Sequence, residues 1–466
     1  MKHLFAWLCF CIGATTHAEQ KETEASIEDI LSLGLPVLTV LTDNAEEPSA
    51  DYLKQSDGYP LSTIANATKV PGRTILMTQN DTLYDSGGYV PDKSGMTIKI
   101  RGNSSAYGEK KSYKIKLQKK ADLLCRPDDG TDYRDKNWVL LRTDQSRSIL
   151  NIMTGLKINE LMGLPWTPAF RYVNVVINGD YRGVYALAES VRRNAECRLD
   201  VDKQTGFIVE YDPYYWAEDL YVESSIPSNM HYTFKYPEAD EITQAQLDDV
   251  TRAIEETEKT IRSNIVTKID ISSFANWLLA HDILGTSDAH GSNIFLMKYD
   301  NTDATKVQMC NMWDFDTIAQ SEGKWTYVHS PGLFYYYYLF HYSNTPFIDA
   351  YESRWREVET TLFDAVQDWL DNFSASEEAR ALEASRLLEN QRYNKNTNSV
   401  SQDVMAFKAW FSDRRLWINS QLSVPAGVTT VMEKRFCDIP YNIKGMPATA
   451  ILGGIVIKSG KKRLLK

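Results

Sequence analysis

Residues 284–318 read LGTSDAHGSNIFLMKYDNTDATKVQMCNMWDFDTI, and this stretch decides the fold that we expect for the chain. It contains two acidic sites: Asp288, followed after four intervening residues by Asn293, and the sequence WDFD at 313–316. The residues between these sites predict two short strands and a polar turn, namely IFLM at 294–297, VQMCNM at 307–312 and DNTD at 300–303. The segment therefore predicts a hairpin with carboxylate and amide side chains at its ends.

This layout is typical of a phosphoryl-transfer site. Such a site needs a carboxylate near the attacking oxygen, and an amide oxygen and a second carboxylate for the metal ions that neutralise the phosphates. Asp288 is the candidate for the first role, and Asn293 and Asp314 are the candidate metal ligands, with Asp316 in support. The alternative is that each residue simply forms a turn or caps a helix, because Asp and Asn favour those positions.

Several motifs upstream of this segment occur in a fixed order. They are IKIRGNSS (98–105), KKSYKIKL (110–117), KNWVLL (136–141), LMGLP (161–165), VINGDYRGVY (176–185) and FKYP (234–237). Together with the two acidic sites, they resemble the CotH family of atypical protein kinases, named for a spore coat protein, over roughly residues 35–422. The resemblance implies an α+β, two-lobed, protein-kinase-like fold with a β-rich N-lobe and a helical C-lobe. It also implies ATP as substrate, magnesium or manganese as cofactor, and a protein acceptor.

The lysine that binds the ATP phosphates is expected on the strand that follows the loop at 103–108. Lys111, Tyr113, Ile115 and Leu117 share one face of that strand. Kinases clamp the α- and β-phosphates with a strand lysine that is held by a glutamate. We therefore expect Lys111 to bind ATP and to pair with Glu189. The ordinary alternatives are a solvated lysine and a surface glutamate at the end of a strand.

The N-terminus predicts export. Residues 1–18 have the charged start, the apolar run and the small residues before the cleavage point of a secretory signal peptide. No run reaches the ~20 apolar residues that a membrane-spanning helix needs. A formal net charge of −11 gives the chain no reason to bind nucleic acid. We expect a secreted protein that is periplasmic, on the outer surface or extracellular.

The cysteines of the exported chain are not spaced as zinc ligands are. Cys125, Cys197, Cys310 and Cys437 contain no CxxC pair, so a zinc site is not expected. Disulfides form outside the cytoplasm, but the sequence leaves the pairing open.

The remaining regions predict the domain organisation. Residues 19–34 form a polar leader, 35–424 the kinase-like domain and 425–466 a small β tail. The domain ends in helical segments at 352–373, 376–396 and 401–422. The tail, with YNIKG at 441–445, GGIVIK at 453–458 and a basic end, resembles the C-terminal sorting tails of secreted Bacteroidetes proteins. That resemblance implies a surface or secretion-system partner, whereas a plain accessory β-hairpin is the alternative.

The leading hypothesis is a secreted kinase that phosphorylates Ser or Thr of extracytoplasmic proteins, with Asp288 orienting or deprotonating the acceptor hydroxyl. Two rivals remain open because ATP is scarce outside the cytoplasm. One is another nucleotide-dependent modification on the same scaffold, such as AMPylation or glutamylation. The other is a non-catalytic surface or coat-assembly protein with a vestigial kinase fold.

Overall fold

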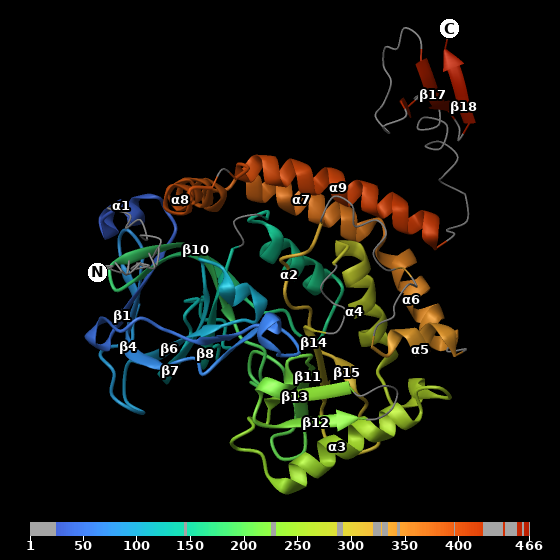
Figure 1. Ribbon diagram of the computed structural model, residues 1–466, viewed down its shortest axis with the longest axis horizontal. Coiled ribbons are helices and arrows are strands. Elements are labelled where there is room, and N and C mark those ends of the chain that lie inside the picture. Colours follow the sequence, from blue (N-terminus) through green and yellow to red (C-terminus); the bar gives the residue numbers. More distant parts are fainter. Residues whose placement is uncertain are drawn as a thin grey trace, which may run out of the picture. The chain divides into compact units, whose positions relative to one another are not determined.

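Two compact units are present in the computed structural model, one up to residue 415 and one from residue 416 onward. The structure describes residues 25–143, 147–224, 230–286, 292–319, 328, 334–342, 345–395, 397–422, 441–442, 454–458 and 461–465. The predicted signal peptide therefore lies outside the described residues, as does Asp288. Figure 1 shows the first unit with its strands in blue through green to yellow and most of its helices in yellow and orange.

The first sheet closes into a barrel. Its strand order is β1-β9-β10-β8-β7-β6-β4-β5, and β1 also pairs with β4, so that the sheet returns on itself. The strand β1 is parallel to β9 and antiparallel to β4. The strands are β1 (Val37–Thr42), β4 (Val70–Met77), β5 (Thr82–Asp85), β6 (Met96–Arg101), β7 (Ser112–Ala121), β8 (Asp135–Arg142), β9 (Phe170–Ile177) and β10 (Asp180–Glu189).

Alternating apolar side chains fill the inside of this barrel. Ile98, Ile115, Trp138 and Tyr185 belong to this core and are almost completely buried. Since successive residues of a strand point to opposite faces, the residues between them lie on the outside of the barrel. A separate hairpin of β2 (Asp51–Leu53) and β3 (Thr63–Ala65) precedes β4 in the chain.

A second sheet follows in the chain and is antiparallel throughout. Its order is β12-β13-β11-β14-β15. The strands are β11 (Phe207–Tyr211), β12 (Tyr221–Ser224), β13 (Met230–Tyr236), β14 (Ile294–Lys298) and β15 (Gln308–Met309). Its last two strands, β14 and β15, correspond to the two runs predicted as strands at 294–297 and 307–312. The predicted α+β class is confirmed, and the two-lobed kinase-like arrangement stays a prediction.

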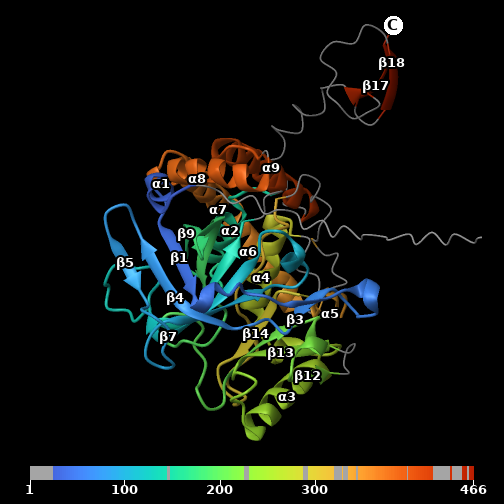
Figure 2. The same ribbon diagram turned by 60° about the vertical axis from the view of Figure 1, so that its left-hand side comes forward.

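The two sheets share a hydrophobic core, which brings the outside of the barrel against the second sheet. Val139 and Ala188, on β8 and β10, belong to this core with Ile208, Phe295 and Trp313. Figure 2 shows the second sheet, in green and yellow, beside the barrel strands. Outward-facing side chains on this part of the barrel are therefore partly covered by the second sheet.

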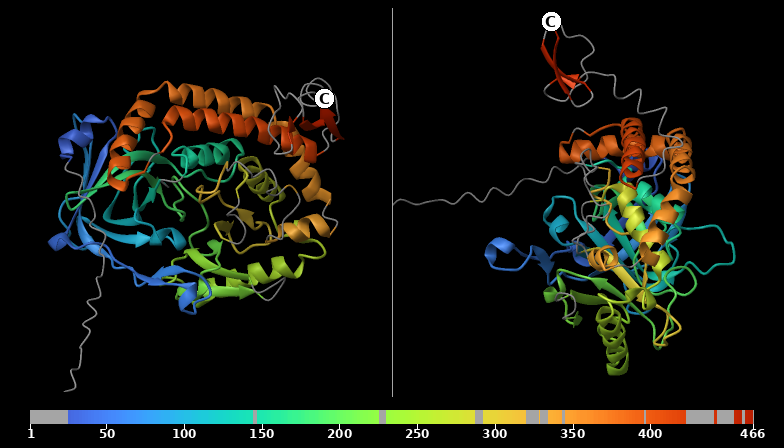
Figure 3. Two further views of the ribbon diagram at one scale, coloured as in Figure 1. Left: turned by 45° about the horizontal axis from the view of Figure 1, so that its top comes forward. Right: turned by 90° about the vertical axis from the view of Figure 1, so that its right-hand side faces the viewer.

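The helices of the described residues are α1 (Ile27–Ser32), α2 (Asn151–Leu161), α3 (Gln244–Lys259), α4 (Ile271–Leu284), α5 (Tyr336–His341), α6 (Thr345–Val358), α7 (Thr361–Ser374), α8 (Glu377–Tyr393) and α9 (Val400–Gln421). The helix α8 contacts β10, and α2 and α6 contact α4. Figure 3 shows α7 and α8 (orange) and the α2 and α4 helices (green to yellow) around the strands. The single helix expected at 352–373 is wrong, since α6 ends at Val358 and α7 begins at Thr361.

This break lets aromatic side chains from both helices pack together. Trp355 of α6 meets Phe363 of α7 edge to face at 5.9 Å between ring centres, and Phe363 stacks on Phe411 at 4.0 Å.

Among the described residues no helix is long and apolar enough to cross a membrane. The tail contains a three-stranded antiparallel sheet of β16 (Tyr441–Asn442), β17 (Gly454–Lys458) and β18 (Lys461–Leu465).

Candidate functional site

The hairpin of β14 and β15 brings the two candidate metal ligands to the same end of the second sheet. Leu296 pairs with Met309, and the Cys310 N–H donates to the Phe295 carbonyl at 2.9 Å. Because the two strands are antiparallel, the residue just before β14, Asn293, and the residues after β15, which include Asp314, lie at the same end of the hairpin. The predicted hairpin is thus present. Asp288 lies outside the described residues, so its place relative to these two side chains stays a prediction.

Asn293 and Asp314 share an uncommon backbone conformation. Their φ angles are 61° and 62°, in the left-handed region. Asn and Asp enter this region more easily than other residues with a side chain, but it remains sparsely populated and such residues cluster at functional sites. The Asp316 N–H donates to Asp314 Oδ1 at 3.3 Å, which fixes the turn between the two acids. This bond holds the Asp314 carboxylate in a defined direction.

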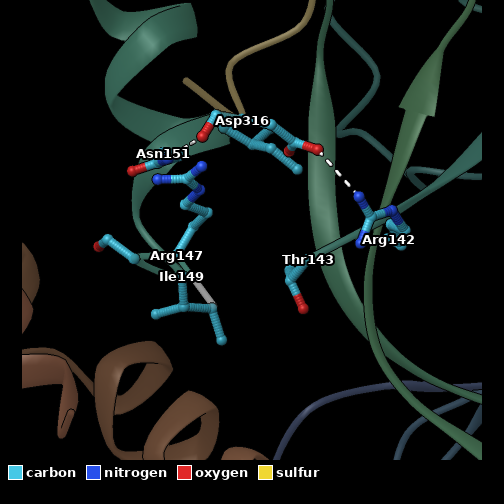
Figure 4. A pocket seen from close by; sticks show the side chains of 8 residues that line it. Arg142, Thr143, Arg147, Ile149, Asn151 and Asp316 are labelled. Carbon is cyan, nitrogen blue, oxygen red and sulfur yellow. Dashed lines mark hydrogen bonds and ion pairs between the residues drawn. The ribbon is translucent and has the colours of Figure 1, made fainter. Parts of the chain in front are cut away.

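Asp316 connects the WDFD turn to the barrel and to α2. Its Oδ2 lies 3.2 Å from Arg142 Nη2 on β8, and its carbonyl accepts from Asn151 Nδ2 at 3.4 Å. Figure 4 shows Asp316 and Arg142 across a small polar pocket, with Thr143, Arg147 and Asn151 on its other walls. The carboxylate of Asp316 is one-third exposed. Its predicted part in metal binding is untested, and its observed partner is an arginine.

The ring of Phe315, between these two acids, lies directly against α2. A Cβ atom added at Gly155 would lie 2.5 Å from Phe315 Cγ and closer still to two other ring atoms. Glycine in the middle of a helix reduces its stability by roughly 1 kcal/mol relative to alanine. The close approach gives a reason for glycine here, since only this residue lets the WDFD turn pack on the helix.

Arg101 of the barrel places its positively charged side chain beside this turn. It ends β6, and its guanidinium carbon lies 5.8 Å from the centre of the Trp313 ring. Burial lowers the pKa of Arg101, and the charges of Asp314 and Glu210 oppose that effect. Arginine remains protonated under such conditions. The charge of Arg101 is therefore coupled to the carboxylates of Glu210, on β11, and of Asp314, in the turn after β15.

A lysine–glutamate pair lies on the same sheet. Lys235 Nζ on β13 is 2.6 Å from Glu210 Oε2 on β11, and both side chains are largely covered. Burial raises the pKa of Glu210, against the effect of Lys235, and Glu210 in turn raises the pKa of Lys235 in spite of burial. The charge of Glu210 also acts on Arg101. We call Arg101, Glu210, Lys235 and Asp314 the intersheet cluster.

The predicted pairing of Lys111 with Glu189 is not what the structure contains. Lys111 Nζ donates to the Ala106 carbonyl at 2.7 Å and lies 4.9 Å from the Tyr52 ring centre. Glu189, which is 1% exposed, accepts from Arg126 Nη1 at 3.0 Å and from the Ala169 N–H at 3.0 Å. Lys111 precedes β7 and Glu189 ends β10, and each already has partners near its own strand end. Both residues hold neighbouring segments together.

Two further lysines face each other on the outer surface of the barrel. Lys99 of β6 is directly opposite Lys114 of β7, and like charges in such positions destabilise a sheet. Burial, and then the charges of Lys99 and Arg192, lower the pKa of Lys114 to about 8. Lys114 is itself opposite Val139, which belongs to the core between the sheets. A group of partly covered cations that repel one another is suited to bind an anion.

Sequence reasoning missed Arg101, Lys114, Glu210 and Lys235 as site residues, although three of them lie in the quoted motifs. Lys111 was favoured because it shares a face with apolar residues. The structure shows that Lys114 is partly covered as well, because the second sheet packs over the outside of the barrel. One available signal was Glu210, a single charge within the apolar run FIVEY at 207–211. Charged residues inside buried strands usually have a partner.

The described residues contain no cluster of three or more His, Cys, Asp or Glu that could hold a metal ion by itself. They do supply a carboxylate and an amide at one end of a hairpin. Magnesium is commonly bound through one or two carboxylates and the phosphates of the substrate, with water completing the shell. Asn293 and Asp314 therefore fit a magnesium–nucleotide complex better than a permanently bound metal.

Comparison with known proteins gives one family. A model described as CotH kinase protein matches residues 98–410, a range that includes the whole intersheet cluster and the β14–β15 hairpin. No curated protein matches the chain.

Proposed function

The chain belongs to the CotH kinase family, and we propose that it is a secreted atypical kinase that transfers the γ-phosphate of ATP to Ser or Thr of extracytoplasmic proteins. The observation that carries this proposal is the intersheet cluster. It combines a largely covered lysine–glutamate pair and an arginine with Asp314, which lies at the same end of a hairpin as Asn293. Phosphoryl transfer depends mainly on positioning and on charge stabilisation, and these groups supply both.

The cations of the cluster would bind the nucleotide phosphates. Lys235, held by Glu210, would take the role that the lysine of a lysine–glutamate pair has in kinases, and Arg101 would add a second positive charge. Lys99 and Lys114, opposite each other on β6 and β7, would add two further cations. A triphosphate would relieve the repulsion between these lysines, and that relief contributes to its affinity.

The opposite side of the site would bind metal and acceptor. Asn293 and Asp314 would hold magnesium or manganese, which when bound neutralises the charge that develops on the phosphates. Asp288 would accept the proton of the acceptor hydroxyl as its oxygen attacks the γ-phosphorus and the bond to the ADP oxygen breaks. Asp316 would support Asp314 through the turn that they share. The acceptor is proposed to be a protein, in keeping with the predicted signal peptide and an extracytoplasmic location.

Paired variants test the assignment of the ATP lysine. Lys235→Met should weaken Mg–ATP binding at least about tenfold, because it removes the cation nearest Glu210, while Lys111→Met should leave binding within about twofold. The measurement is titration calorimetry of the purified protein with Mg–ATP. If the Lys111 variant loses more affinity than the Lys235 variant, the proposed phosphate site is wrong.

A second pair tests the metal-binding end of the hairpin. Asp314→Asn should abolish magnesium-dependent transfer of labelled phosphate from ATP to a generic protein acceptor. Asp300→Asn is the matched control, since Asp300 lies in the turn at the other end of the same hairpin and bonds to Thr302 and Thr305. Equal transfer in the wild type and the Asp314 variant would refute the proposal. A product carrying AMP or glutamate in mass spectrometry would identify one of the rival reactions instead.

A further inference from the structure

The helix α2 presents three buried residues to the WDFD turn at a regular spacing. Asn151, Gly155 and Asn159 are four positions apart, so they lie along one face of the helix. The two asparagines form hydrogen bonds with the backbone of the turn segment, and Gly155 lies against the Phe315 ring. One helix face therefore contacts the chain before, within and after the turn that contains Asp314.

Asn159 makes the shorter of the two hydrogen bonds to this segment. Its Oδ1 accepts from the Met312 N–H at 2.8 Å, while its Nδ2 donates to the Trp166 carbonyl at 2.9 Å and to Thr167 Oγ1 at 2.7 Å. Asn159 and Met312 are both 0% exposed. A buried backbone N–H needs an acceptor, and Met312, which lies beyond the end of β15, obtains this acceptor from a side chain. The Asn159 amide thus anchors the chain just after the sheet ends.

Asp314 lies between two attachment points on α2. Two residues before it, Asn159 holds Met312, and two residues after it, the Asp316 carbonyl accepts from Asn151 Nδ2 at 3.4 Å. The φ angle of Asp314 is 62°. A residue in this sparsely populated conformation persists only where the surrounding structure holds it. The contacts with α2 supply that restraint on both sides of Asp314.

We propose that Asn159 is a positioning residue for the metal site: by accepting the Met312 N–H, it fixes the chain two residues before Asp314 and so sets the direction of the Asp314 carboxylate. The inference rests on the proposed function, in which Asp314 binds magnesium or manganese together with ATP. Asn159 acts only through the chain, since its amide is engaged by Met312, Trp166 and Thr167. Replacing groups that orient metal ligands typically lowers metal affinity about 10–100-fold.

Two variants separate the acceptor oxygen from the rest of the side chain. Asn159→Ala removes the acceptor of the Met312 N–H. Asn159→Asp keeps an oxygen at this place, but it brings a charge into the core and loses the donor to the Trp166 carbonyl, so it should lower stability without releasing Met312. Thr167→Val is the matched control, because it removes a bond of the same side chain on the side away from the turn.

The measurements compare nucleotide binding with and without metal. One is the dissociation constant of the Mn²⁺ complex of AMP-PNP, an ATP analogue that is not hydrolysed, from water-proton relaxation; the other is that of AMP-PNP with EDTA, from calorimetry. Asn159→Ala should weaken binding of the manganese complex about tenfold and binding of the metal-free analogue less than about twofold, because it displaces a metal ligand and no cation. Asn159→Asp and Thr167→Val should bind both forms within about threefold of the wild type, whatever their stability in urea.

The pattern of affinities decides between a positioning role and a merely structural one. Wild-type affinity of Asn159→Ala for the manganese complex, or an equal loss for both forms, would overturn the inference. A loss in Asn159→Asp or Thr167→Val as large as that in Asn159→Ala would also overturn it. If Asn159→Ala does not fold, Asn159→Leu carries the test, since it fills a similar volume without an acceptor, and the same outcomes apply.

Failure of the kinase proposal gives a different result. If the wild type transfers no phosphate but the variants show the expected affinities, the kinase proposal is refuted and the positioning role of Asn159 stands. If the wild type does not bind the manganese complex at all, both are overturned.

Discussion

Replacing Gly155 by alanine should destabilise the protein, although the same change in most helices stabilises them. In an ordinary helix interior this substitution is favourable by about 1 kcal/mol. Here the new Cβ would lie 2.5 Å from Phe315 Cγ and closer still to two other ring atoms, whereas ordinary contacts begin near 3.4 Å, so the ring must move by more than about 1 Å. Overpacking of a well-packed core costs about 1–3 kcal/mol. We therefore expect a net loss of stability of about 1 kcal/mol.

The same displacement should weaken nucleotide binding. Phe315 is buried, and its neighbours Asp314 and Asp316 are held by a left-handed backbone and by Arg142, so the ring cannot retreat alone. Mg–ATP affinity should fall about tenfold, which corresponds to about 1.4 kcal/mol. Calorimetric titration measures the affinity, and urea unfolding measures the stability.

A matched control for this prediction is Gly88→Ala. An added Cβ at Gly88 meets no atom within 4 Å, so this variant should keep wild-type stability and nucleotide affinity. A Gly155→Ala protein that is about 1 kcal/mol more stable than the wild type and binds Mg–ATP equally well would refute the packing of Phe315 on α2 and its link to the site.

Three further predictions concern charge. ATP affinity should weaken as pH rises from 7 to 9, because the pKa of Lys114 is about 8 and its positive charge is lost in that range. In Lys114→Arg, the ATP affinity should depend less on pH, since arginine stays protonated. Lys110→Met should lower the free energy of unfolding by about 3–5 kcal/mol, because it leaves the Glu389 carboxylate buried opposite an apolar group. Urea titration should find a smaller loss of stability in the double variant Lys110→Met, Glu389→Leu, which has no buried charge at this place. Burial raises the pKa of Glu258 from 4.5 to about 7, so the folded state binds its proton more tightly and stability falls as pH rises between these values; melting curves of Glu258→Gln should show a weaker decline, and an unchanged pH dependence would contradict this.

Local sequence signals predicted the parts of the site that depend on short-range structure. The motif at 176–185 contains Asn178-Gly179, and the structure has a two-residue turn there between β9 and β10, with φ angles of 52° and 85°. The β14–β15 hairpin follows in the same way from a polar turn between apolar runs. The resemblance to the CotH family is confirmed by the family match, whereas the sorting role of the tail stays a prediction.

Long-range contacts decided what the sequence could not reveal. Burial of Lys114 depends on the second sheet covering the outside of the barrel, and no periodicity within β7 reports that. The pair of Glu210 and Lys235 depends on β11 and β13 being neighbours, with a bulge at Ile208 and Val209. The position of Glu189 at a strand end predicts that it can pair with a lysine, but Arg126 and Arg198 lie against its carboxylate instead.

Closure of the barrel has a practical consequence for work with fragments. The family match begins at residue 98, within β6, and so omits β1 and β4. A fragment cut at that point would leave β9 without its parallel neighbour β1, and β6 without β4, one of its two antiparallel neighbours. Both would become open sheet edges, which attract other chains and promote aggregation. Expression limits placed before Val37 keep the ring of strands whole, and insolubility of a shorter fragment would say nothing about its chemistry.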